Sequence, residues 1–232
     1  MTVAHNDCRT CKIRDCSILK VCSNKVLGII SNQKQTNFIS KEKHLFREGD
    51  TINGIYFIKS GILKLIKENP HSRSLILKFV KEGMILGYRE LGLIAHHNTS
   101  AIAITDVQYC FIPLDQFHKI LEDCDLLKEQ ALLQLIQELR ETENKAFSLA
   151  NKSVKSKVAN ALLSLSSFFN YDENSAEFEV NFNRQDIADW IATTKEQVSK
   201  SIKELERDAI IKSTGKKFVI LDNEKLTSIA VS

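Results

Sequence analysis

The sequence has little of several features that mark whole classes of protein. Its 232 residues include only two prolines and eight glycines, which excludes collagen-like and Pro/Gly-rich disordered chains. No apolar run approaches the roughly 20 residues that a membrane-spanning helix needs. The N-terminus, with Asp7, Arg9 and Lys12, lacks the apolar core of a signal peptide. We therefore expect a folded, cytoplasmic protein with no membrane partner.

Two further absences narrow the function. The net charge is only +3, so any affinity for nucleic acid must come from a local basic patch. No Ser/His/Asp or Cys/His constellation with supporting motifs occurs, so the sequence predicts that the protein is not an enzyme.

The glycines divide the chain into a β region and a helical region. Six of the eight lie between Gly49 and Gly92, and none occurs from Leu93 to Thr214. Short strands alternating with turns are typical of a roll or barrel. They are expected at residues 55–58, 62–66, 75–80, 101–104 and 108–112. We predict an α+β protein with a cysteine-rich N-terminal segment (1–25), a β-roll (26–122), a long dimerisation helix (123–152) and a C-terminal winged helix-turn-helix (153–232).

The long helix carries an apolar stripe that one subunit has no evident means of covering. Apolar residues recur at three- and four-residue steps after Pro113, and Thr142 and Glu143 interrupt them. Burial against the same helix of a second copy would give a homodimer with a coiled-coil-like seam. The expected interface residues are Leu132, Leu135, Ile136, Leu139, Glu143, Ala146 and Ala150. The alternative is that the stripe packs on its own roll.

Two helix-start signals follow in close succession near residue 190. After a helix at about 154–169 and a short strand over 178–182, Asn183-x-x-Asp186 resembles a capping box. Ala192-Thr193 breaks that helix, and Thr194-x-x-Gln197 opens another. The apolar residues Val198, Ile202 and Leu205 share one face of the second helix. Its opposite face is polar and suits a DNA major groove.

A predicted β-hairpin with a basic tip comes next. Residues 210–211 and 218–221 flank Ser213-Thr214-Gly215-Lys216-Lys217, which suits phosphate contact. The candidate DNA contacts are Arg184, Thr194, Lys195, Glu196, Ser199, Lys200, Lys203, Lys216 and Lys217. The alternatives are a merely solvated helix surface and, more remotely, a ligand-binding module that binds no DNA.

Six cysteines form an unusual pattern for a cytosolic chain. Four of them, Cys8, Cys11, Cys16 and Cys22, fall within fifteen residues, and a disulfide framework is not expected in a reducing compartment. Two interpretations of the four N-terminal cysteines stay open: that they form a zinc site, or that they act as a thiol switch. Residues 96–97, two histidines, are expected in a solvated loop without a ligand role.

These residues resemble the bacterial regulators typified by the cyclic-AMP receptor protein and the fumarate and nitrate reductase regulator, the CRP/FNR family. Residues 183–188 are similar to the family's Thr-Arg-Gln-Glu-Ile-Gly, and residues 46–50 and 55–61 resemble its turn-rich strands. The resemblance implies a β-roll sensor, a homodimer on palindromic double-stranded DNA and contact with RNA polymerase. Glu196, Ser199 and Lys200 align with positions that read a half-site beginning TTGA, although the family's usual Arg is Lys200 here.

The resemblance also implies what the roll senses. The cyclic-nucleotide branch needs a Gly-Glu-Leu turn and an Arg-Ser pair; here the turn begins at Arg89 and the arginine position is Thr99, so cyclic-nucleotide binding is not expected. The oxygen-sensing branch binds a [4Fe-4S] cluster through four cysteines. Cys16, Cys22 and Cys110 match its pattern. The fourth expected position is Ile13, so the resemblance leaves Cys11, or alternatively Cys8, as the fourth ligand. The alternative is a regulator without a cluster that responds to a small molecule, zinc or thiol redox state.

Overall fold

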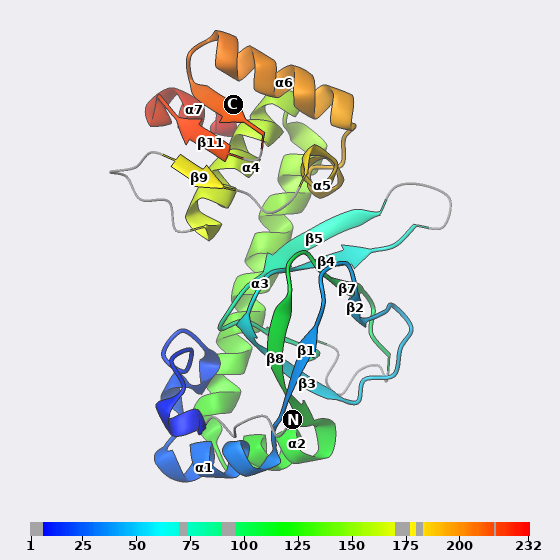
Figure 1. Cartoon of the computed structure of the whole chain (residues 1–232), viewed down its shortest axis with the longest axis vertical. Coiled ribbons are helices and arrows are strands. Elements are labelled where there is room, and N and C mark those ends of the chain that lie inside the picture. Colours follow the sequence, from blue (N-terminus) through cyan, green and yellow to red (C-terminus); the bar gives the residue numbers. More distant parts are fainter. Residues whose placement is uncertain (1–6, 70–73, 90–95, 170–176, 180–182, 216) are drawn as a thin grey trace. The chain divides into compact units, whose positions relative to one another are not determined.

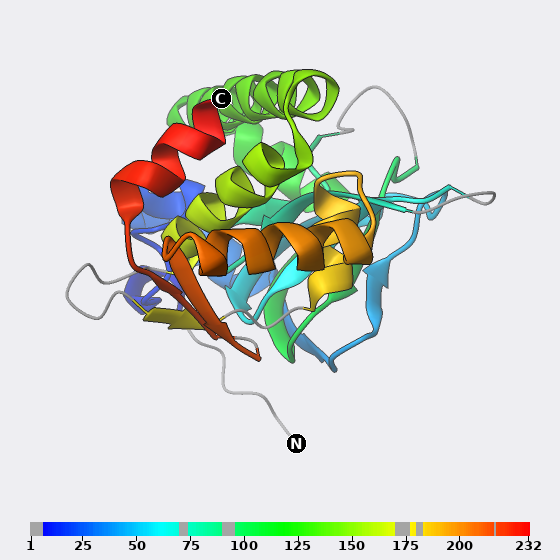
Figure 2. The same cartoon turned by 90° about the horizontal axis from the view of Figure 1, so that it is seen from above.

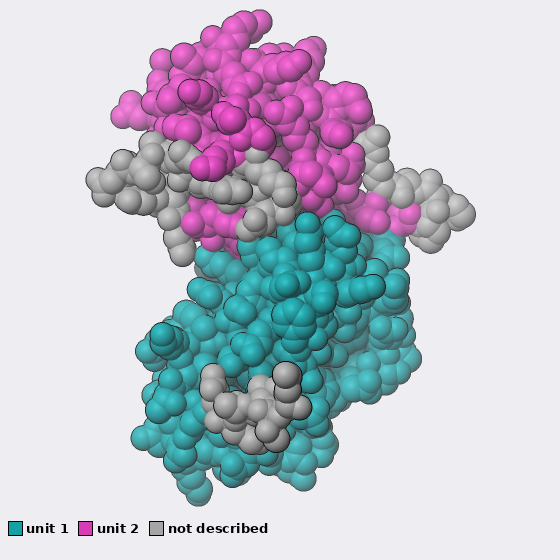
Figure 3. Space-filling model, in the orientation of Figure 1, with its two compact units in different colours: residues 1–68, 77–141 teal, residues 69–76, 142–232 magenta. Residues whose placement is uncertain are grey.

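The computed structural model describes residues 7–69, 74–89, 96–169, 177–179, 183–215 and 217–232. The chain forms two compact units, shown in Figure 3: residues 1–68 with 77–141, and residues 69–76 with 142–232. The long helix α3 (Asp125–Asn151) belongs to the first unit up to Glu141 and to the second from Thr142. Each unit is described by itself.

The N-terminal segment of the first unit is a chain of short, capped helical turns. Asp7, Ser17 and Ser23 each accept a bond from a backbone N–H at the start of the turn that follows. These turns are η1 (Cys8–Thr10), η2 (Ile18–Val21) and α1 (Asn24–Gln33). In Figure 1, α1 and α2 (Leu114–Glu122) lie side by side at one end of this unit.

Antiparallel strands form the body of the roll in two sheets. One sheet has the order β1 (Gln35–Ile39), β8 (Val107–Pro113), β3 (Gly54–Ser60) and β6 (Ile85–Leu86). The other has the order β2 (His44–Phe46), β7 (Ser100–Ala103), β4 (Leu63–Lys67) and β5 (Leu75–Val80). The turn between β3 and β4 requires Gly61: its φ is +89°, and a Cβ there would lie 2.2 Å from the carbonyl oxygen of Asp106.

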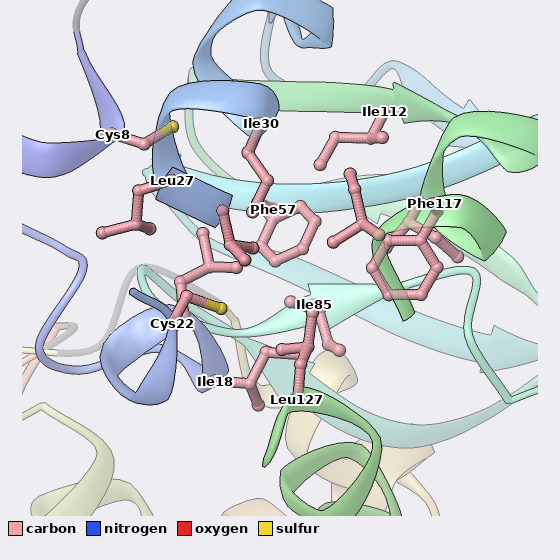
Figure 4. Close-up of a cluster of buried hydrophobic side chains, with 14 of the residues drawn as sticks. Cys8, Ile18, Cys22, Leu27, Ile30, Phe57, Ile85, Ile112, Phe117 and Leu127 are labelled. Atoms are coloured by element: carbon pink, nitrogen blue, oxygen red, sulfur yellow. The ribbon is translucent and has the colours of Figure 1, made fainter. Parts of the chain in front are cut away.

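A buried cluster joins the N-terminal segment to one sheet of the roll. Figure 4 shows side chains from several elements meeting in it, among them Cys8, Cys22, Leu27, Ile30, Phe57, Ile112 and Phe117. Leu127, in the first turns of α3, belongs to the same cluster. The core therefore holds the cysteine-bearing segment close to the start of the long helix.

In the second unit, helix α4 (Val154–Phe168) packs against two other helices, and a short helix and a small sheet complete the unit. Its elements are α4 (Val154–Phe168), β9 (Glu177–Glu179), α5 (Arg184–Trp190), α6 (Lys195–Arg207), β10 (Ile211–Thr214), β11 (Lys217–Ile220) and α7 (Asn223–Val231). The sheet order is β10, β11, β9. Helix α4 packs against both α6 and α7, and its Val158, Leu162 and Leu165 are completely buried or nearly so. Figure 2 shows the β10–β11 hairpin beginning at the end of α6.

The architecture confirms the predicted α+β fold class of a β-roll, a long helix and a winged helix-turn-helix. The strands expected at 75–80 and 108–112 form β5 and most of β8. The short helices α1, α2 and α7 were not predicted. Of the strand expected over 178–182, residues 180–182 lie outside the described part of the chain.

One prediction about the roll was half wrong. His96 is exposed as expected, but His97 is only 2% exposed and its ring stacks on Phe46 at a centroid distance of 3.8 Å. Burial lowers the pKa of His97. The side chain is therefore part of the packing of the roll rather than of a solvated loop.

Candidate functional site

The two short helices α5 and α6 meet through a turn that the sequence defines closely. Asn183 Oδ1 accepts bonds from the N–H groups of Gln185 (2.8 Å) and Asp186 (3.0 Å), and Asp186 Oδ2 accepts one from the N–H of Asn183 (2.9 Å). The predicted capping box is therefore complete. Ala192, with φ of +51°, reverses the chain, and Thr194 then caps α6.

The cap of α6 differs in one detail from the prediction. Thr194 Oγ1 accepts a bond from the N–H of Gln197 (3.2 Å), as expected. The Gln197 side chain, however, accepts a bond from the hydroxyl of Thr193, so it does not complete a reciprocal box.

Helix α6 has one buried face and one polar face. Val198, Ile202 and Leu205 are fully buried, as predicted. Lys195, Glu196, Lys200 and Lys203 are exposed, and Ser199 and Thr194 are half-buried. Arg184, from α5, donates to the hydroxyl of Ser199 at 3.4 Å. The structure therefore brings the candidate contacts of α5 and α6 together around one polar surface.

The hairpin that follows is tied to α6. Strands β10 and β11 pair antiparallel, and Gly215 at their turn has φ of +64°. Glu206 of α6 accepts bonds from the backbone N–H and the hydroxyl of Ser213, at 2.9 and 2.7 Å. Lys217 is exposed, and Lys216 lies outside the described residues. The Glu206 link fixes where the hairpin starts relative to the polar face, and the sequence argument missed it.

Along α3, the predicted interface residues are mostly exposed. Leu132 and Leu139 are 58% and 60% exposed, and Ile136, Glu143, Ala146 and Ala150 are also exposed. Leu135 is the exception, because it packs partly against the core cluster of its own unit. Leu126, Leu133 and Phe147, spaced at seven and fourteen residues, are exposed beside this stripe and were not predicted.

The candidate ligand cysteines occupy different environments. Cys22 and Cys110 are buried, Cys11 is half-buried and Cys16 is exposed, its thiol donating to the carbonyl of Ile13 at 3.2 Å. Burial raises the pKa of Cys22 to about 12, and the nearby thiol of Cys124 adds to the shift. Burial also raises the pKa of Cys110, against the influence of Lys34. Protonated thiols do not bind metal, so a metal would have to displace these protons.

A small cavity of about 30 Å³ connects part of this set. Three thiols and three cations line it: Cys8, Cys11, Cys110, Arg14, Lys34 and Lys59. Gly83 also lines it, and a Cβ at Gly83 would lie 2.7 Å from Cys16 Sγ. Cys22 is not among the lining residues. Among the described residues, no three metal-ligating side chains stand in a geometry ready for a metal ion.

Two segments of the chain match known protein families. Residues 37–124 match the family model "Cyclic nucleotide-binding domain", and residues 156–229 match "Crp-like helix-turn-helix domain". The chain is 25% identical to the transcriptional activator protein Anr of Pseudomonas protegens, over 98% of this chain and 94% of the relative. It is 24% identical to the fumarate and nitrate reduction regulatory protein of Escherichia coli K12, over 94% of this chain and 89% of that protein.

The chain belongs to the CRP/FNR family of transcription regulators. The solved structure of FixK2 from Bradyrhizobium japonicum has the same fold, with a TM-score of 0.77 at 20% identity, covering 86% of this chain and 98% of that one. This CRP/FNR regulator is therefore a DNA-binding protein of the helix-turn-helix type.

The cyclic-nucleotide positions of this CRP/FNR chain are occupied by other interactions. Arg89 binds Glu138, and residues 90–95 of the expected turn lie outside the described residues. Thr99 is buried, and the hydroxyl of Ser100 donates to Glu68 at 2.7 Å. A carboxylate thus stands next to the serine, where it would repel an incoming phosphate.

No described helix combines the length and the apolar composition that a bilayer crossing demands.

Proposed function

We propose that this CRP/FNR regulator binds a palindromic duplex as a homodimer in the cytoplasm, with each α6 lying in a major groove. The observation that carries the proposal is the division of α6: its apolar face is fully buried, whereas its opposite face presents Glu196, Ser199 and Lys200. In this arrangement those three side chains read base edges, and Arg184, Thr194, Lys195 and Lys203 serve backbone contact or positioning.

The hairpin supplies further phosphate contacts in this proposal. Lysines at its tip, Lys216 and Lys217, would neutralise phosphates without reading bases. Contact with RNA polymerase, which the family resemblance implies, would then make the DNA-bound dimer a regulator of transcription.

The DNA-binding proposal is tested with two duplexes of equal length. One contains two inverted half-sites beginning TTGA and the other is scrambled. We expect the wild type to prefer the first, and Lys200→Ala to remove most of that preference. Arg207→Ala is the matched control, because it removes a positive charge from the exposed end of the same helix. Equal binding of both duplexes by the wild type would reject the proposed base contacts.

We also propose that the N-terminal cysteines and Cys110 bind a [4Fe-4S] cluster. The support is the chemistry of the site: Cys11 and Cys110 line one cavity, Cys16 lies against Gly83 beside it, and Cys22 is buried in the neighbouring core. Arg14, Lys34 and Lys59 would offset the negative charge of thiolate ligands. Such a cluster would supply an oxygen-sensitive redox centre.

The residues around the cysteines suggest how binding of the cluster would affect helix α3. Cys8 and Cys22 share a buried cluster with Cys124 and Leu127, which stand at the start of α3. Holding the cysteine segment against β8 would therefore also constrain the first turns of α3. Cys8, buried and on the same cavity as Cys110, is as well placed as Cys11 to be the fourth ligand.

Iron and acid-labile sulfide in protein purified without oxygen test the cluster. We expect both in the wild type, and we expect Cys110→Ser to lose them as completely as Cys16→Ser, because each change removes one thiolate ligand. Cys124→Ser is the control and should keep them. Comparing Cys8→Ser with Cys11→Ser then assigns the fourth ligand. Full metal content in Cys110→Ser would reject this ligand set, as would a wild type without iron.

A further inference from the structure

One lysine near the end of α3 is covered where its neighbours are exposed. Lys145 is half-buried, whereas residues 142–144 and 146–147 are exposed. Lysine is among the residue types that are mostly exposed, because its ammonium is strongly hydrated. An ammonium that loses part of its hydration is expected to bind other groups in exchange. The groups around Lys145 therefore indicate what this side chain does.

Two groups of the second unit meet the ammonium of Lys145. Its Nζ donates to the backbone carbonyl of Ile76, in β5, at 2.5 Å. The same atom lies over the ring of Trp190, 5.7 Å from the ring centre, which is within the range of a cation–π attraction. Burial lowers the pKa of Lys145 to about 7, so this lysine carries its proton at pH 6.

Trp190 leads directly to the turn before α6. It is the last residue of α5, and Ala192, whose φ of +51° reverses the chain, follows two positions later. Ile187 and Ala188 anchor α5 because both are fully buried or nearly so, whereas Trp190 is only half-buried. A contact that holds the Trp190 ring therefore also holds the end of α5 from which the turn begins.

We propose that Lys145 is a positioning residue for DNA recognition: its ammonium, anchored on the carbonyl of Ile76, holds the Trp190 ring and thereby the turn that starts α6. Lys145 itself touches no DNA. This inference rests on the proposed reading of bases by α6. The alternative is that the stem of Lys145 only covers apolar surface, in which case its charge has no role.

Trp190 is the only tryptophan of the chain, so its fluorescence reports on the surroundings of this ring alone. At pH 6, Lys145→Met keeps an unbranched chain of similar length but removes the charge, and it should change the Trp190 emission. Lys145→Arg keeps a cation that stacks on aromatic rings and should stay closer to the wild type. Lys128→Met, an exposed lysine of α3 paired with Asp125, is the matched control and should leave the emission unchanged. Unchanged emission in Lys145→Met would overturn the proposal.

DNA binding separates positioning from direct contact. Lys145→Met should bind the duplex with inverted TTGA half-sites about threefold or more weakly than the wild type, and Lys145→Arg should restore the affinity. A lysine on a phosphate would also reduce the salt dependence, by a slope of about one per lysine, so a positioning residue leaves that slope unchanged. A reduced slope, or equal affinity of Lys145→Met and wild type, would reject this inference. A wild type without preference for this duplex would instead reject base reading by α6.

A double-mutant cycle covers the case in which Lys145→Met does not fold. Lys145→Gln loses the charge but keeps an N–H donor for the Ile76 carbonyl, and Trp190→Leu removes the aromatic face. If Lys145 acts through Trp190, Lys145→Gln should weaken DNA binding far less in the Trp190→Leu background than in the wild type. Equal losses in the two backgrounds would show that Lys145 does not act through Trp190, and would reject the proposal.

Discussion

Helices α6 and α3 are both amphipathic, but the apolar face is buried in α6 and largely exposed in α3. In α6, Val198, Ile202 and Leu205 are fully buried within one chain. In α3, Leu132 and Leu139 are more than half exposed, and the buried residue at the middle of the helix is the charged Glu138. An exposed apolar stripe of this length is typical of a surface that another molecule covers. The contrast supports the proposed homodimer, in which a second copy would cover the apolar stripe of α3, whereas the apolar face of α6 is already buried in one subunit.

Truncating a buried residue of α6 is expected to have the largest effect. Ile202→Ala should lower the free energy of unfolding by about 2–5 kcal/mol, because it leaves a cavity in a packed core. Urea titration at low protein concentration measures this loss. Leu139→Ala is the comparison and should change that value by only about 0.5 kcal/mol or less, since its side chain is exposed in one subunit. Equal losses would contradict the contrast between the helices.

The same Leu139→Ala change should have its main effect on association. The change removes one leucine from each subunit of the homodimer, and covering each contributes about 1.5–3 kcal/mol, so the dimer dissociation constant should rise by about 100-fold or more. Sedimentation over a concentration series measures it. Gln137→Ala, an exposed change outside the predicted interface, serves as the control. Unchanged association of Leu139→Ala would favour a monomer, or an interface on another surface.

The difference between the helices also shows what could be predicted from the sequence. Caps and turns are local, so Asn183, Thr194 and the break at Ala192 were found from residues a few positions apart. The polar face of α6 followed from helical spacing. The wing hairpin followed from its turn residues, and β10 and β11 pair across that turn.

What escaped prediction depends on residues far apart in the chain. The burial of His97 requires Phe46, and that of Glu138 requires Lys78 and Arg89. Leu135 shares the spacing of the exposed stripe, yet it faces the core of its own unit. For the cysteines, sequence spacing grouped Cys22 with Cys16, but burial places Cys22 beside Cys124. The candidate DNA contacts and the ligand set remain predictions that the experiments above decide.

The caps of α5 and α6 offer a finer comparison on the DNA-reading side. Asn183 Oδ1 accepts two backbone bonds and Asp186 returns one, whereas Thr194 Oγ1 accepts one. We therefore expect Asn183→Ala to cost about 1–2 kcal/mol of unfolding free energy and Thr194→Ala about 0.5–1 kcal/mol. Urea titration of both variants checks the order. A Thr194→Ala loss as large as that of Asn183→Ala would mean that the reciprocal bond adds nothing.

The last expected effect, on association only, returns to α3 and concerns Glu143. Ile136, Glu143 and Ala150 are seven residues apart, so a two-fold seam through Ile136 brings each Glu143 near the same residue of the second copy. Two carboxylates about 4 Å apart in water repel each other by about 1 kcal/mol. Glu143→Leu removes this repulsion and extends the apolar stripe, so the dimer should dissociate at least about fivefold less readily. Sedimentation measures the change, and Glu141→Leu, on the same helix but outside the seam, is the control. If Glu143→Leu leaves the dissociation constant unchanged or raises it, Glu143 lies outside the interface and the seam does not extend beyond Leu139.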